Sequence, residues 1–236
     1  MTKETSKPSD VKAVDTERRE LLTSAGAGVV AATFSGVGFA GSKNPAGARP
    51  LRWGIVGTGG IANSMAPRSH QADNAELVAV SSRRMASAEK FADKHGVTKA
   101  FDSWADMARW DGLDAIYVAT PTSIREEICV AAANSGKHVL GEKPFANLDS
   151  LQRITAACKQ NGVGFMDGTH FVHSPRTRQI KSSTAEMVGW PWSVASAFQF
   201  SLTDKSNIRM NPNLEPYGAI GDAGWYNMRA AVEYTS

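Results

Sequence analysis

The chain has 236 residues, of which 42% are hydrophobic and 21% charged, and its formal net charge is +3 at pH 7. This composition is typical of a globular protein with one or two domains and excludes a disordered or fibrous chain. Residues 1–50 hold seven of the 26 Lys and Arg and five of the 23 Asp and Glu, so the remainder is nearly neutral and we expect no nucleic-acid partner.

The first 50 residues are predicted to be an export leader. Arg18 and Arg19 precede an uncharged stretch, 21–42, which is long enough to cross a bilayer but too weakly apolar to stay there, so we expect no stable membrane span. With a small-residue cleavage sequence at 46–48, this pattern indicates a twin-arginine signal and a periplasmic protein. An acidic residue on each side of the arginine pair is atypical. A leader without a targeting role, an uncleaved anchor and a cytoplasmic location therefore stay open.

From Leu51 onward, short apolar runs alternate with amphipathic segments of helix length, which is typical of βαβ units and a parallel sheet. The predicted strands are 51–56, 77–81, 115–119, 138–140 and 164–167. The predicted helices are 61–68, 86–95, 124–135 and 148–160. We therefore predict an α/β fold in which residues 51–168 form a doubly wound parallel sheet. Cys129 and Cys158 fall in predicted helices without a metal-ligand spacing, so we expect packed thiols and no metal site.

A glycine-rich turn joins the first predicted strand to the first predicted helix. Its residues are Gly57, Thr58, Gly59, Gly60, Ile61 and Ala62. Gly57 permits the tight turn, Gly59 lets a pyrophosphate approach the backbone, and Ala62 allows the helix to pack closely on the strand. The helix N-terminus presents free N–H groups and the positive end of its dipole. Strand, turn and helix in this order predict a dinucleotide site in a Rossmann domain.

The end of the second predicted strand indicates which nucleotide binds. An acidic residue there would hold the ribose 2′-hydroxyl of NAD, whereas this chain has Ser82, Arg83 and Arg84. A hydroxyl followed by arginine suits the 2′-phosphate of NADP, so we expect NADP rather than NAD. The alternative is that the two arginines form a solvated surface pair.

The segment Gly141-Glu142-Lys143-Pro144 follows the strand 138–140. Ligands bind outside the carboxyl ends of such strands, so Lys143 is placed to reach a cofactor or substrate; the alternative is an ordinary surface lysine. Pro144 restrains the lysine backbone, and the bond between them can be cis.

Beyond Thr169 the pattern changes. Apolar and polar residues alternate over 192–203, which predicts a strand with one covered face. We therefore expect residues 169–236 to begin a second domain, of the α+β class with an open sheet. His170, His173 and Arg176 are candidate substrate residues, with packing or capping at the domain joint as the alternative.

The chain resembles the glucose-fructose oxidoreductase, inositol dehydrogenase and MocA family. The resemblance rests on four segments in family order, which are Arg52–Ala62, Ala119–Ser123, Gly136–Pro144 and Gly221–Tyr226. The pairing of EKP with GDxGxY is specific. It implies an NADP-dependent oxidoreductase that transfers hydride between nicotinamide and a hydroxyl of a sugar, polyol or diol. It also implies that Thr120, Pro121 and Glu142 contribute to the cofactor site.

The resemblance further implies that Lys143, Asp222 and Tyr226 carry the chemistry. Tyrosine at 226 resembles the dihydrodiol and xylose dehydrogenase branch, where the inositol branch has histidine. A phenol with a pKa of about 10 is a poor base at neutral pH, so we expect the ammonium of Lys143 to favour the phenolate. Arg125 stands where many members have a histidine that steadies structure or cofactor.

Residues 169–236 are fewer than the second domain of the family requires. We therefore expect a chain truncated at the C-terminus, with an intact cofactor fold, weak or absent activity and a tendency to self-associate through uncovered apolar surface. The full-length protein is expected to be a homo-oligomer. Two other functions stay open on this fold: nucleotide binding without turnover, and reduction of an imine or a conjugated double bond.

Overall fold

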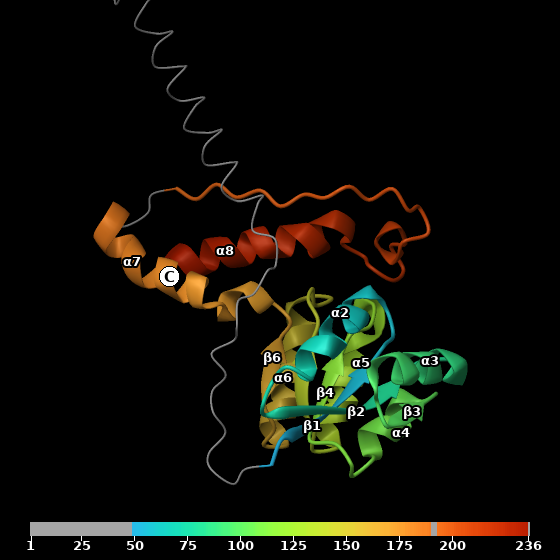
Figure 1. Ribbon diagram of the computed structural model, residues 1–236. Coiled ribbons are helices and arrows are strands. Elements are labelled where there is room, and N and C mark those ends of the chain that lie inside the picture. The colour runs from blue at the N-terminus through green and yellow to red at the C-terminus, as the bar shows by residue number, and fades with distance from the viewer. Residues whose placement is uncertain (1–48, 190–192, 236) are drawn as a thin grey trace, which may run out of the picture. The chain divides into compact units, whose positions relative to one another are not determined.

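The computed structural model describes residues 49–189 and 193–235. The expected leader, apart from its last two residues, lies outside these ranges. Six strands form one parallel sheet in the order β3-β2-β1-β4-β5-β6 (Figure 1). They are β1 (Leu51–Val56), β2 (Ala75–Ser81), β3 (Lys99–Phe101), β4 (Ala115–Val118), β5 (His138–Gly141) and β6 (Phe165–Asp167). The chain order reverses between β1 and β4, so the prediction of a doubly wound Rossmann sheet is confirmed.

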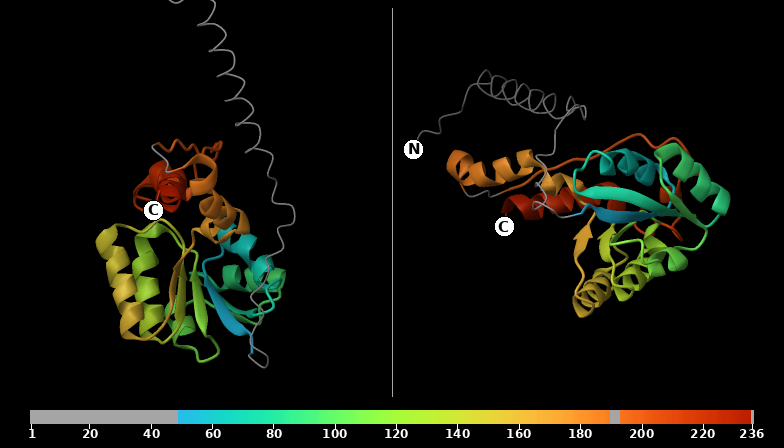
Figure 2. Two further views of the ribbon diagram at one scale, coloured as in Figure 1. Left: turned by 90° about the vertical axis from the view of Figure 1, so that its left-hand side faces the viewer. Right: turned by 60° about the horizontal axis from the view of Figure 1, so that its bottom comes forward.

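Five helices cover the two faces of this sheet. They are α2 (Gly60–Ser69), α3 (Met85–His95), α4 (Trp104–Arg109), α5 (Thr122–Asn134) and α6 (Leu148–Gln160). One buried cluster unites apolar side chains of α4, α5 and α6 with the sheet, and a second unites those of α2 and α3 with it. Figure 2 shows α5 and α6 in yellow-green on one side of the sheet and α2 and α3 in blue-green on the other.

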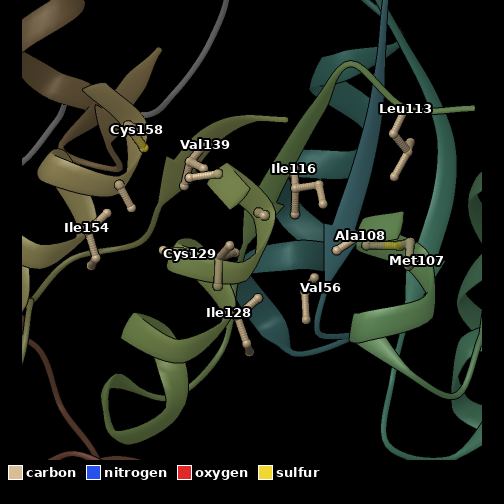
Figure 3. Close-up of a cluster of buried hydrophobic side chains, with 14 of the residues drawn as sticks. Val56, Met107, Ala108, Leu113, Ile116, Ile128, Cys129, Val139, Ile154 and Cys158 are labelled. Carbon is tan, nitrogen blue, oxygen red and sulfur yellow. The ribbon is translucent and has the colours of Figure 1, made fainter. Parts of the chain in front are cut away.

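Apolar side chains between the sheet and α4, α5 and α6 form the larger cluster (Figure 3). All four residues of β4 are buried because helices cover both faces of this central strand. Cys129 on α5 and Cys158 on α6 are both buried in this cluster, and burial raises the pKa of each thiol, which confirms that they are packed side chains.

The sequence pattern missed two short elements, β3 and α4. Both have too few residues to show a clear period. β3 pairs with β2 over three positions, and the side chain of Ser103 caps α4 by accepting from the backbone N–H of Asp106 at 3.2 Å.

The part of the chain after β6 consists of helices joined by irregular segments. They are η1 (His170–His173), α7 (Pro175–Val188), η2 (Ile208–Met210), the π-helical turn η3 (Ile220–Gly224) and α8 (Trp225–Thr235). Lys181 on α7 lies 3.6 Å from Glu233 on α8. None of the helices within the described ranges is long and apolar enough to cross a membrane.

The strand predicted over 192–203 is wrong for the residues described, 193–203, which form no strand. Alternation of apolar and polar residues is not sufficient, because a strand also needs a neighbour for its backbone hydrogen bonds, and no described strand pairs with this segment. The expected open sheet is therefore not found among the described residues. Phe198 and Phe200 are 47% and 50% exposed. Self-association and the domain boundaries stay predictions.

Candidate active site

The glycine-rich turn leaves the carboxyl end of β1 and enters α2. Gly57 has φ +105°, and its N–H donates to the carbonyl of Ser81 at 2.8 Å. A Cβ on Gly57 would lie 2.6 Å from the carbonyl oxygen of Ala119, so both backbone conformation and space require glycine there. Gly59 and Gly60 face open space instead, because no atom lies within 4 Å of a Cβ at either position.

The N-terminus of α2 is open to a ligand. Its N-cap residue, Gly59, has no side chain to bond the first N–H groups of the helix. The side-chain amide of Asn63 donates to the carbonyls of Thr58 and Gly59, both at 3.0 Å, and so fixes the turn. The hydroxyls of Thr58 and Ser82 lie 3.5 Å apart, which places the end of β2 beside the turn. Arg83 follows directly and is exposed.

A buried arginine connects the loops that follow β4 and β5. Arg125 donates from Nη2 to the carbonyl of Thr120 and from Nη1 to that of Pro144 and to Thr122 Oγ1. Burial lowers the pKa of Arg125. The hydroxyl of Thr120 is buried and has no partner among the described residues. A polar atom in that position leaves hydrogen-bonding capacity for a ligand at the carboxyl end of β4.

A glutamate from a distant segment caps α5. Glu215 Oε1 accepts from the backbone N–H of Thr122 at 3.1 Å, and Oε2 accepts from the Thr122 hydroxyl at 2.6 Å. Pro121, the N-cap residue, offers no side-chain cap. The segment around Glu215 is thereby fastened to the loop that contains Thr120 and Pro121.

Glu142 has its carboxylate inside the protein rather than at its surface. Its Oε1 accepts a hydrogen bond from the buried hydroxyl of Tyr117 at 2.5 Å, and burial and this carboxylate raise the pKa of Tyr117. A Cβ on Gly168 would lie 2.9 Å from the carboxylate, so the loop after β6 packs directly against it. These contacts hold the end of β5, from which Lys143 projects.

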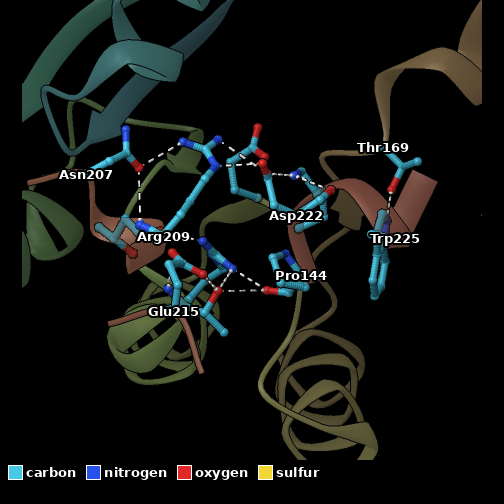
Figure 4. Close-up of polar contacts among 12 residues, drawn as sticks. Pro144, Thr169, Asn207, Arg209, Glu215, Asp222 and Trp225 are labelled. Atoms are coloured by element: carbon cyan, nitrogen blue, oxygen red, sulfur yellow. Dashed lines mark hydrogen bonds and ion pairs between the residues drawn. The ribbon is translucent and has the colours of Figure 1, made fainter. Parts of the chain in front are cut away.

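Lys143 is bound by Asp222 of η3, and Figure 4 shows Asp222 with its polar contacts. Its Nζ donates to Asp222 Oδ1 at 2.5 Å and to the Asp222 carbonyl at 3.1 Å, and the lysine side chain is only 8% exposed. Arg209 of η2 holds the same carboxylate, with Nε 2.6 Å from Oδ2. Burial acts to raise the pKa of Asp222, but the hydrogen bonds from Arg209 and Lys143 outweigh it, so the pKa is lowered. The bond between Lys143 and Pro144 is cis, as the sequence allowed.

Tyr226, in the first turn of α8, lies beside the lysine. The Nζ of Lys143 is 4.8 Å from the centre of the phenol ring, so the ammonium faces the ring. The rings of Phe198 and His170 contact Tyr226 edge-on at 5.3 and 5.6 Å between centres. Burial, Glu142 and Asp222 raise the pKa of Tyr226 to about 12. The prediction that Lys143 favours a phenolate on Tyr226 is therefore wrong for this arrangement. The nearby carboxylates and the loss of solvent favour the neutral phenol instead.

Of the three substrate candidates, the structure brings only His170 to Tyr226. His173 and Arg176 are exposed, and within the described ranges neither side chain has a hydrogen bond, ion pair or ring contact with Lys143, Asp222 or Tyr226. Across residues 49–189 and 193–235, no group of three His, Cys, Asp or Glu side chains could hold a metal ion.

Tyr117, Arg209 and Glu215 also hold this site together, but none of them was predicted from the sequence. Tyr117 stands in an apolar strand pattern, and neither Arg209 nor Glu215 belongs to a motif. Their partners are distant in the sequence, so no local signal identifies them.

A parallel sheet with an open glycine turn at its reversal point and a bound lysine at the same edge defines a dinucleotide-binding Rossmann domain. The family described as "Oxidoreductase family, NAD-binding Rossmann fold" (GFO_IDH_MocA) matches residues 51–169, which is half of the chain. The chain therefore belongs to the Gfo/Idh/MocA oxidoreductase family.

Two curated relatives are similar over most of this chain. D-xylose 1-dehydrogenase (NADP(+)) 2 of Haloferax volcanii is 34% identical over 77% of this chain and 56% of that protein. The dTDP-3,4-didehydro-2,6-dideoxy-alpha-D-glucose 3-reductase of Actinomadura kijaniata is 31% identical over 80% of this chain and 57% of that protein. A mutant 3-ketoreductase from A. kijaniata, solved with TDP-benzene and NADP, matches with a TM-score of 0.71 at 27% identity, over 79% of this chain and 57% of that one. The chain thus spans a little over half the length of these proteins.

Proposed function

We propose that this protein is an NADP-dependent oxidoreductase that transfers hydride between nicotinamide and a hydroxyl-bearing carbon of a sugar, polyol or diol. One observation carries the proposal: the ammonium of Lys143 lies almost buried at the end of β5, bound by Asp222 and facing the ring of Tyr226. The names of the xylose dehydrogenase and the sugar 3-reductase among the relatives support the substrate class.

The residues around the glycine turn fit the dinucleotide. Gly59 and Gly60 leave open space at the N-terminus of α2, where a pyrophosphate can reach free N–H groups. The buried hydroxyl of Thr120 has no hydrogen-bond partner in the part of the chain that the structure describes. The hydroxyl of Ser82 lies beside the turn and Arg83 follows it in the chain, and a 2′-phosphate needs hydrogen-bond donors there. When bound there, NADP supplies the nicotinamide that accepts or gives the hydride.

Lys143 and Tyr226 can then handle the substrate oxygen. Among the described residues, Lys143 has two acceptors for its three N–H groups, both on Asp222, so one N–H is left to orient a substrate hydroxyl or carbonyl. A phenol whose pKa is about 12 is protonated at neutral pH. It can therefore give a proton to the carbonyl oxygen when the substrate is reduced. In the reverse direction the phenol has to lose that proton before it can act as a base.

A nucleotide and substrate screen tests the proposed function. We expect the purified protein to bind NADP and to change the absorbance of the nicotinamide band with at least one aldose, polyol or diol. Binding of NADP with no turnover across the whole set would contradict the proposal and leave a nucleotide-binding protein.

Replacing Arg83 with alanine is expected to weaken NADP binding at least about tenfold while leaving NAD binding nearly unchanged. Loss of a charge-assisted hydrogen bond to the 2′-phosphate has this size. Titration of both nucleotides by calorimetry measures the effect. Arg109→Ala is the matched control, because Arg109 is an exposed arginine on α4 that pairs with Asp106. Equal affinity of the unmutated protein for NADP and NAD would rule out a role for Arg83 in cofactor choice.

We propose further that the leader directs export by the twin-arginine route. The arginine pair supports this proposal. Arg49 donates to the carboxylate of Asp114 at 2.5 and 2.8 Å, so cleavage after residue 48 would leave this ion pair in the mature protein. We expect a mature N-terminus at Arg49, recovery in the periplasmic fraction with NADP still bound, and retention in the cytoplasm when Arg18 and Arg19 become lysine. Fractionation with N-terminal sequencing measures this. Unmutated protein that stays cytoplasmic and uncleaved would contradict export.

A further inference from the structure

Arg209 is a second cation on the carboxylate that binds Lys143. It belongs to η2, whereas Asp222 belongs to η3 and Lys143 to the loop after β5. Arg209 Nε donates to Asp222 Oδ2 at 2.6 Å, and its Nη2 lies 3.3 Å from Oδ1. Each cation therefore has its shortest bond to a different carboxylate oxygen. Lys143 donates to Oδ1 at 2.5 Å, whereas the shorter bond from Arg209 goes to Oδ2.

The position of Arg209 is itself fixed. Its backbone N–H donates to Asn207 Oδ1 at 3.1 Å, and its Nη1 lies 3.4 Å from the same oxygen. Its guanidinium faces the ring of Phe200 at 5.7 Å. Figure 4 shows Arg209 between Asn207 and Asp222. A guanidinium held from both sides can orient a carboxylate, because its donors lie in a rigid plane.

On the basis of the proposed function, we propose that Arg209 is a positioning residue: by holding Oδ2 of Asp222, it keeps this carboxylate ionised and turned so that Oδ1 binds Lys143. It touches neither substrate nor nicotinamide in this role. Its effect passes through Asp222 to the lysine that orients the substrate oxygen.

The charges around Asp222 give the sign of the effect. Within residues 49–189 and 193–235, Lys143 and Arg209 are the cations that contact it, and Tyr226 is the titratable neighbour on α8. Burial acts to raise the pKa of Asp222, and the two cations hold it below its ordinary value. Without Arg209, burial remains and one cation is lost, so the pKa of Asp222 rises. The carboxylate then takes up a proton at a higher pH and no longer accepts from Lys143 with full charge.

Titration of Asp222 in variants of Arg209 tests the proposal without a substrate. The carboxyl carbon of Asp222 is followed by NMR in aspartate-labelled protein and assigned from its loss in Asp222→Asn. Arg209→Met and the more polar Arg209→Gln are expected to raise the midpoint by about one pH unit or more, and Arg209→Lys, which keeps the charge, by less. Arg229→Met is the matched control, because Arg229 is 33% exposed against 36% for Arg209 and also pairs with carboxylates, those of Asp167 and Glu233.

The pH profile of turnover shows whether Arg209 acts on catalysis through Asp222 or only stabilises the fold. We expect the acidic limb for Arg209→Met and Arg209→Gln to move up by the same amount as the NMR midpoint, with NADP affinity unchanged. An unmoved midpoint in both variants overturns the proposal, and so does a moved midpoint with an unmoved profile. If the unmutated protein turns over no substrate, the proposed function fails, and the NMR midpoint alone decides whether Arg209 controls Asp222.

Discussion

Replacing Lys143 with methionine is expected to lower turnover at least about a hundredfold and to leave NADP affinity within a few-fold of the unmutated value. Loss of a group that orients or transfers a proton has this size. Methionine keeps most of the aliphatic stem of the nearly buried lysine and removes the ammonium that lies 4.8 Å from the ring centre of Tyr226. Single-turnover and steady-state rates measure the change. Lys181→Met is the control, because Lys181 is 47% exposed and pairs with Glu233, away from Tyr226 in its interactions.

Tyr226→Phe should show a loss of the same size for a different reason. Phenylalanine keeps the ring that packs against Phe198 and His170, and it removes only the hydroxyl. Tyr217→Phe is the matched control, because Tyr217 uses its hydroxyl to donate to the carbonyl of Ala146. Turnover within a few-fold of the unmutated protein in either Lys143→Met or Tyr226→Phe would remove that side chain from the mechanism.

Replacing Gly57 with alanine is expected to lower the free energy of unfolding by about 2–5 kcal/mol. A non-glycine residue at positive φ costs roughly 1–2 kcal/mol, and a methyl group forced into a filled space adds roughly 1–3 kcal/mol. Here φ is +105°, and the methyl carbon would lie 2.6 Å from the carbonyl of Ala119, which is backbone and cannot turn away. Chemical denaturation measures the loss.

Gly59→Ala is the matched variant. It should leave the free energy of unfolding nearly unchanged and weaken NADP binding. Gly59 has φ −75°, and a Cβ there would meet no atom within 4 Å, so stability should change little. The added methyl occupies the space through which a pyrophosphate approaches the N-terminus of α2. Loss of two or more charge-assisted hydrogen bonds should weaken NADP binding at least about a hundredfold. Unchanged nucleotide affinity in Gly59→Ala would show that the dinucleotide binds elsewhere.

The sequence by itself determined the Rossmann sheet and its glycine turn, because both depend on patterns of residues that are close together in the chain. Five predicted strands lie within a few residues of the observed β1, β2, β4, β5 and β6, and four predicted helices lie equally close to α2, α3, α5 and α6. A buried strand needs an apolar run, a covering helix needs its periodic face, and a turn at positive φ needs glycine wherever the rest of the chain lies. The short β3 and α4 were not predicted, because three or six residues are too few to show a clear period of apolar residues.

The tertiary structure alone decided how the catalytic candidates meet. Asp222 binds Lys143 from 79 residues away and shares its carboxylate with Arg209, and no local pattern links these positions. The pKa of Tyr226 followed its burial and its carboxylate neighbours instead of the ammonium that the motif suggested. Residues 193–203 carry the alternation of a strand but form none, because backbone hydrogen bonds need a partner that the pattern of one segment cannot supply.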